Sequence, residues 1–181
     1  METMEGMNDN EDNGIVLPAV KSVDLEKAAD ESPEKFCNFV EQKILDGIGG
    51  TLDATTMPRL NGSQITLIAY MTMREELLQG GFVQLIYNGY GPFIFENPFA
   101  KAMRLWGIKE LCNMLYDVRR MYEKDKDEIT RPCSDEQFMA LYERFEQYDK
   151  YDDGFVEAEP EYTGKVAQYV FSNIADFAVV S

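Results

Sequence analysis

The apolar residues of this chain recur every three to four positions, which is typical of amphipathic helices. Ser32, Pro33 and Glu34 mark a clear helix start, because they supply a capping hydroxyl, a proline at the first helical position and an acid in the first turn. The apolar stripe of this helix comprises Phe36, Phe39, Val40, Ile44 and Leu45. The glycine-rich sequence DGIGG, residues 46–50, is expected to end it.

A second helix is predicted over residues 63–79, and its first half, ITLIAYM, is apolar on every side. A helix without a polar face is normally buried, so we expect this one to lie in the middle of the fold. Gly80 and Gly81 should stop it, with Gly80 as the left-handed cap. The sequence FVQLIYN that follows is expected to form a short helix or turn, closed by Gly89.

Four more helices are predicted by the same periodicity, over residues 99–106, 108–124, 134–148 and 161–174. Ser134 and Gln137 form a capping box at the start of the third of these. Strand-like alternation is limited to the sequence FAVVS at the C-terminal end. The pattern therefore predicts an all-α protein. It consists of a single compact domain of six or seven helices over residues 32–181, preceded by a flexible acidic arm over residues 1–31.

The charge of the chain narrows its chemistry. The sequence has no histidine, which excludes Ser-His-Asp and Cys-His catalysis and removes the commonest transition-metal ligand. The net charge is −16, so direct binding to nucleic acid is not expected, since phosphates repel carboxylates. The negative charge is clustered: residues 1–34 carry a net −8 and residues 123–161 a net −9, whereas residues 35–122 carry +1.

The cysteines and the hydropathy of the chain indicate a location. Cys37, Cys112 and Cys133 are widely spaced and odd in number, which argues against a disulfide framework and against a paired zinc motif. No apolar run approaches the roughly 18 residues of a membrane span, and the acidic N-terminus lacks the apolar region of a secretory signal. We therefore expect a cytoplasmic protein that does not contact a membrane.

The sequence YDKYDDGFVE, residues 148–157, raises the alternative of a calcium-binding EF-hand loop. The residues that fit the positions of that loop are Asp149, Asp153, Gly154 and Glu157. Tyr151 and Pro160 occupy two positions at which the loop needs a carboxylate. We therefore interpret the stretch as an acidic helix end and loop that carries surface charge, and we predict no metal site.

Two other functional classes find little support in the sequence. The segment FAKAMRLWGIKELCNML has the outline of a DNA-binding helix-turn-helix, but its second helix carries Glu110 and Asp117 and is not basic. Glu75 and Glu76 are consecutive, so on a helix they diverge by about 100° and make a poor acid–base pair. The sequence predicts neither an enzyme nor a cofactor.

The segment REELLQGGFVQLIYNGYG, residues 74–91, resembles the hallmark E-V-x-x-G-G-F-x-Q-x-x-x-N of the small acidic, helical bacterial DNA-mimic proteins and their uncharacterised relatives. The matching residues are Glu76, Gly80, Gly81, Phe82, Gln84 and Asn88. The resemblance extends over roughly residues 65–177. Gln84 and Asn88 lie on one helix face and can hydrogen-bond each other or backbone carbonyls, so the residues themselves favour a structural role for the motif.

The resemblance implies a protein that binds another protein without catalysis. The characterised member of the family is similar to double-stranded DNA in shape and charge, forms a dimer and occupies the DNA-binding surface of a transcription factor. We therefore expect a homodimer and a basic partner, such as a transcription factor or another DNA-binding protein. The acids expected to face the partner are Asp135, Glu136, Glu143, Glu146, Asp149, Asp152, Asp153, Glu157, Glu159 and Glu161. An immunity- or antitoxin-type neutraliser of a basic toxin needs the same negative surface and stays open as the alternative.

Overall fold

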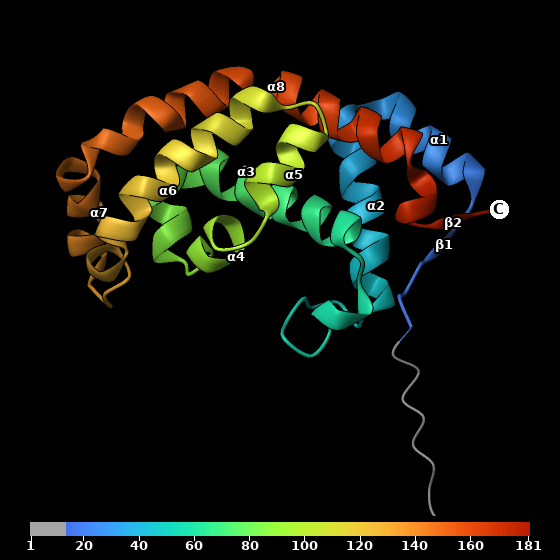
Figure 1. Ribbon diagram of the computed structural model, residues 1–181, viewed down its shortest axis with the longest axis horizontal. Helices are drawn as coiled ribbons and strands as arrows, with labels where there is room; N and C mark the ends of the chain where they lie inside the picture. The colour runs from blue at the N-terminus through green and yellow to red at the C-terminus, as the bar shows by residue number, and fades with distance from the viewer. Residues whose placement is uncertain (1–13) are drawn as a thin grey trace, which may run out of the picture.

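Helix α3 (Gly62–Tyr87) runs through the middle of the molecule, and the other helices are arranged around it (Figure 1). The computed structural model describes residues 14–181. The consecutive residues 67–71 of α3 are all buried, so its first half is enclosed on every side. This confirms the central position that the continuous apolar sequence predicts.

Within residues 14–181 the chain forms eight α-helices and two short strands. Their order is β1 (Ala19–Val20), α1 (Ser22–Glu31), α2 (Pro33–Gly47), α3, α4 (Gly91–Phe95), α5 (Phe99–Leu105), α6 (Lys109–Ile129), α7 (Asp135–Arg144), α8 (Asp149–Ser172) and β2 (Val179–Val180), with 3₁₀ turns at Met57–Arg59, Glu146–Tyr148 and Ile174–Asp176. The all-α fold is confirmed.

The helices pack around one continuous hydrophobic core. Helices α2 and α8 pack on α3 and on each other, and α6 lies against α3, α5 and α8. In Figure 1, α6 and α8 run side by side along the upper edge, and α7 lies at the opposite end of the molecule from α1 and the strands. The acidic C-terminal sequence is therefore concentrated at one end and along one edge.

The helix starts predicted by capping are confirmed at two places. The Ser32 side chain accepts a hydrogen bond from the Lys35 amide at 3.1 Å at the start of α2. At the start of α7, Ser134 accepts from the Gln137 amide at 3.2 Å, and the Gln137 side chain accepts from the Ser134 amide at 2.9 Å. These reciprocal bonds satisfy backbone donors that a helix N-terminus leaves unpaired.

Residues 14–31 differ from the flexible arm that the sequence predicts. Strand β1 pairs in parallel with β2, with Ala19 opposite Val179. Helix α1 packs on α2 and buries Leu25 and Ala28. The apolar patch before α1 thus pairs with β2, and Val20 of this patch is 4% exposed. Residues 1–13, which belong to the same prediction, lie outside the described residues.

The boundary between the last two helices also differs from the prediction. The helix that starts after Ser134 ends at Arg144 instead of near Tyr148, and α8 begins at Asp149 instead of near residue 161. The acidic stretch YDKYDDGFVE is therefore mostly helix, not loop. Tyr148 is buried in the turn between the helices and donates a hydrogen bond to the Asp125 carboxylate at 2.9 Å.

Candidate partner-binding surface

Four carboxylates form a row along the exposed side of α8. This acidic row consists of Asp149, Asp153, Glu157 and Glu161. The residues are four positions apart and a helix rises about 1.5 Å per residue, so neighbours lie about 6 Å apart along the axis and the whole row is about 18 Å long. The opposite side of α8 is buried in the core, which directs the acidic row toward solvent.

Further exposed acids extend this negative surface past the beginning of α8. Asp135 and Glu136 lie in the first turn of α7, and Glu143 lies in its last turn. Glu146 is exposed in the 3₁₀ turn between α7 and α8. The exposed acids therefore extend from the acidic row to α7, the helix at one end of the molecule (Figure 1).

Two basic residues near the exposed acids, Arg144 and Lys165, form ion pairs. Arg144 donates to the Glu128 carboxylate of α6 at 3.0 Å, so its charge is directed away from α8. Lys165 pairs with Glu161 at 2.9 Å, at the end of the acidic row. The acids of the row that form no ion pair within residues 14–181 are Asp149, Asp153 and Glu157.

Glu159, one of the acids predicted to face the partner, points into the molecule instead. Its side chain is 13% exposed and accepts hydrogen bonds from Arg74 at 2.6 Å and from the Thr163 hydroxyl at 2.6 Å. Thr163 is in turn 2.7 Å from the hydroxyl of buried Tyr70. This inward orientation follows from the helical conformation of residues 149–172, which turns Glu159 to the side opposite the acidic row.

Asp152 also differs from the predicted partner-facing acids. Its carboxylate accepts a hydrogen bond from the backbone amide of Phe82 in α3 at 2.8 Å. The pKa of Asp152 is raised to about 7, mainly by burial and in part by the nearby charges of Asp149 and Asp153, whereas the hydrogen bond from the Phe82 amide lowers it. Of the ten predicted acids, eight are exposed, and these two are engaged inside the fold.

The motif in α3 surrounds a break in the helix. Gly81 has φ 77° and ψ −172°, so Gly81, and not Gly80 as predicted, takes the conformation that favours glycine. A Cβ on Gly80 would lie 2.1 Å from the Gln84 side-chain oxygen, so a larger residue here would displace the Gln84 side chain. Phe82, directly after the break, is fully buried in the core.

The two amide side chains of the motif share one acceptor. Gln84 donates to the Glu76 carboxylate at 3.2 Å, and Asn88 donates to the same oxygen at 2.8 Å. The sequence predicted bonds between the two amides or to backbone carbonyls; the structure instead shows Glu76 bridging the break from the preceding turns. These contacts are internal to α3 and hold its two parts together.

The sequence of this chain matches the family model described as DMP19-like protein over residues 58–173. This protein belongs to the DMP19-like family. It is also 32% identical, over 120 residues, to the DNA mimic protein DMP19 of Neisseria meningitidis serogroup B. That alignment covers 66% of this chain and 73% of the meningococcal protein. The resemblance to the DNA-mimic family that the motif indicates is thus confirmed.

The stretch shared with the DMP19-like family coincides with particular elements. It begins just before α3 and ends just after α8, so it contains the broken helix and the whole acidic row. Helices α1 and α2 and the two strands lie outside the matched residues. The acidic row, the exposed acids of α7 and the motif are therefore within the family's common part, whereas the acidic N-terminal residues lie outside it.

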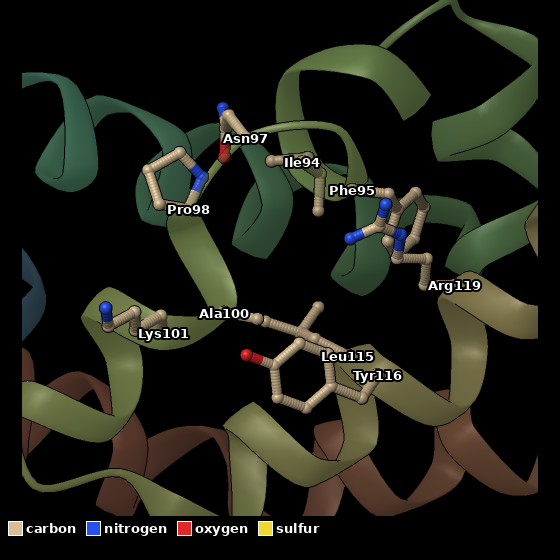
Figure 2. Close-up of a pocket in the computed structure, with 9 residues that line it drawn as sticks. All are labelled: Ile94, Phe95, Asn97, Pro98, Ala100, Lys101, Leu115, Tyr116 and Arg119. Carbon is tan, nitrogen blue, oxygen red and sulfur yellow. The ribbon is translucent and has the colours of Figure 1, made fainter.

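Sequence reasoning missed two hollows around α5. An apolar groove of about 820 Å³ lies between the start of α3, α5 and the end of α8, where Trp106 stacks on Tyr169 at 4.3 Å between ring centroids. Leu105 at its edge is 73% exposed. A smaller pocket of about 170 Å³ lies between the α4–α5 connection and α6, with Lys101, Tyr116 and Arg119 among its lining residues (Figure 2). The periodicity of α5 alone does not predict that Leu105, its last residue, is exposed at the edge of this groove.

A polar pocket between α2 and α3 was missed as well. It has a volume of about 440 Å³, and its lining includes Glu41 and Glu75. Burial raises the pKa of Glu41 to about 7, and the charge of Glu75 adds to the effect. The sequence does not indicate that Glu41 and Glu75 lie in one pocket, because the two acids come from different helices.

Two further findings concern membrane spans and cysteines. Within residues 14–181, no helix is both long and apolar enough to cross a bilayer. Cys37, Cys112 and Cys133 are all free thiols, and the first two are buried.

Proposed function

We propose that this member of the DMP19-like family binds a basic, DNA-binding protein, such as a transcription factor, without catalysing a reaction. The contact surface is the acidic row of α8 together with the exposed acids of α7 and the turn between the helices. The observation that carries the proposal is that three consecutive members of the row, Asp149, Asp153 and Glu157, are exposed and form no ion pair within residues 14–181. The DNA mimic named among the relatives supports this choice over a toxin neutraliser.

The spacing of the acidic row limits what one copy of the chain can imitate. A strand of duplex DNA carries one charge per about 3.4 Å of helix axis, whereas the row carries one per about 6 Å. One copy therefore offers about half the linear charge density of a single strand. A homodimer that places two such rows side by side would carry one charge per about 3 Å, which matches one strand of DNA and about half the density of the duplex. This gain is why the proposal includes a homodimer.

The same surface should act mainly on the rate of association. Negative potential attracts an Arg- and Lys-rich site over a Debye length, which is about 30 Å at 0.01 M salt and about 8 Å at 0.15 M. The acidic row, about 18 Å long, acts as a unit in the first condition, whereas in the second only neighbouring charges, about 6 Å apart, lie within one Debye length. Binding is therefore expected to weaken steeply with added salt.

The test combines capture of a partner with competition by DNA. The full chain is immobilised, proteins of the source organism's lysate are bound at low salt and eluted at high salt, and a captured DNA-binding protein is purified. Excess chain should then displace this protein from its duplex DNA. A nuclease toxin whose activity the chain inhibits would support the alternative, a toxin neutraliser.

A matched pair of triple variants assigns the contact to the acidic row. The variant Asp149→Asn, Asp153→Asn, Glu157→Gln should bind about 3- to 150-fold more weakly, because each exposed ion pair contributes about 0.2–1 kcal/mol. The control variant Asp24→Asn, Glu26→Gln, Asp30→Asn removes the same charge from the exposed side of α1. Equal loss in both variants would show that only total charge matters and would refute the proposed surface.

A further inference from the structure

Three elements meet at the break in α3. From α8, the Asp152 carboxylate accepts a hydrogen bond from the Phe82 amide at 2.8 Å. From α7, the Tyr142 hydroxyl donates to the carbonyl of Gly80 at 3.0 Å. The backbone groups on the two sides of Gly81 are thus each bound by a side chain from a different helix of the acidic end.

We propose that Asp152 is a positioning residue, which holds the acidic row in place by binding the broken backbone of α3, and that it does not contact the partner. A helix that starts anew after a break leaves backbone N–H groups without partners, and leaving such a group buried costs free energy. Asp152 supplies the acceptor for the first of them. In return, the first turn of α8, where the row begins, is fixed on the central helix.

The space around Gly81 supports a specific fit between the two helices. A Cβ on Gly81 would lie 2.3 Å from one Asp152 oxygen and 2.6 Å from its carboxyl carbon. The carboxylate therefore occupies the volume that a side chain at position 81 would need. The left-handed backbone of Gly81 and the inward orientation of Asp152 are two parts of one contact.

The adjacent acids Asp152 and Asp153 have different roles. Asp153 is exposed in the acidic row, and Asp152 is turned toward α3. The groups that face Asp152 are the carboxylates of Asp149 and Asp153 on α8 and the phenol of Tyr142 on α7, beyond which lies Glu76 of α3. The side-chain oxygen of Asp152 stabilises the junction because it accepts the hydrogen bond from the Phe82 amide. The negative charge of Asp152 does not, because the surrounding charged groups are also negative. An asparagine keeps that oxygen and removes the charge.

The test compares two substitutions at each of the two positions. Asp152→Ala should lower the unfolding midpoint by about 2–8 °C. It should also accelerate hydrogen exchange of the Phe82 amide by about tenfold or more. Asp152→Asn should restore both values to those of the unmodified chain. Asp153→Ala and Asp153→Asn should leave both readouts unchanged.

Partner binding adds a readout that a general loss of stability would not reproduce, and this part rests on the proposed function. Asp152→Asn should keep the partner affinity within about twofold, while Asp153→Asn weakens it about 1.5- to fivefold, as expected for one exposed ion pair. If Asp153→Asn has no effect but Asp152→Ala opens the junction, the proposed function fails and the positioning role stands.

Three results would overturn the positioning role. One is an Asp152→Asn variant whose unfolding midpoint falls, and whose Phe82 amide exchange accelerates, as much as in Asp152→Ala. Another is unchanged exchange of the Phe82 amide in Asp152→Ala. The third is a folded Asp152→Asn variant that has lost partner binding. If Asp152→Ala yields no folded protein while Asp152→Asn folds normally, the comparison supports the role of the oxygen acceptor.

Discussion

Replacing Gly81 with alanine tests the broken helix most directly. Gly81 has φ 77° and ψ −172°, a region in which other residues cost about 1–3 kcal/mol. The added Cβ would also displace the Asp152 carboxylate, because it would lie 2.3 Å from an oxygen of that group. Loss of the cap on Phe82 costs about 1–2 kcal/mol more. We expect the free energy of unfolding to fall by about 2–5 kcal/mol, a large part of the 5–15 kcal/mol typical of a domain.

The assay is urea unfolding at pH 7, followed by far-ultraviolet circular dichroism, with the thermal midpoint as a second readout. Each kcal/mol corresponds to about 2–4 °C for a chain of this size. Gly89→Ala is the matched control, because Gly89 also has positive φ (86°) but nothing lies within 4 Å of its added Cβ. That variant should lose only the backbone cost of about 1–2 kcal/mol. Equal losses in the two variants would refute the close fit between Gly81 and Asp152.

Two further predictions concern buried charges. Burial raises the folded-state pKa of Glu41 and Asp152 to about 7, above their unfolded values, so the stability linked to these protons is present at low pH and is lost as pH rises through 7. The thermal midpoint should therefore be lower at pH 8 than at pH 5.5, and the double variant Glu41→Gln, Asp152→Asn should flatten this difference; an unchanged slope would contradict the assignment. Arg74→Met should lower the free energy of unfolding by about 2–4 kcal/mol in urea titrations, because it leaves the Glu159 carboxylate, 13% exposed, without its cation. Adding Glu159→Gln to that variant should recover part of the loss, and a double variant no more stable than Arg74→Met would argue against the pair.

Local signals along the chain predicted much of the fold. The capping residues at Ser32 and Ser134 mark helix starts correctly, because a cap is a contact between residues three positions apart. The continuous apolar sequence of α3 likewise predicts its central position. In each case the information needed lies within a few turns of one helix.

The predicted start of α8 near residue 161 is wrong, because tertiary contacts outweigh the helix-breaking tendency of residues within the helix. Gly154 and Pro160 look like helix breakers, and both lie inside α8. A Cβ on Gly154 would come within 3.5 Å of Met114, so this glycine lies where α8 closely approaches α6. Pro160 is exposed, and so is Val156, whose carbonyl has no N–H partner four positions later and can be hydrated instead.

The candidate surface was predicted as a region more accurately than residue by residue. Clustering of acids in the sequence indicates where negative charge lies, and eight of the ten named acids are exposed. The orientation of Asp152 and Glu159 depends on Phe82 and Arg74, which are distant in the sequence. Only the three-dimensional packing separates acids that face solvent from acids that stabilise the interior.

The parallel pairing of β1 with β2 constrains the order in which this chain completes its fold. Ala19 pairs with Val179, so the contact joins segments near the two ends of the described chain. During synthesis, the β1 segment leaves the ribosome before all the helices and has no partner strand until β2 has followed. Closing a loop of this length costs about 4–5 kcal/mol in chain entropy if it forms first, and little once the helices have brought its ends together. The strand pair is therefore expected to form last, after the helices have already packed together.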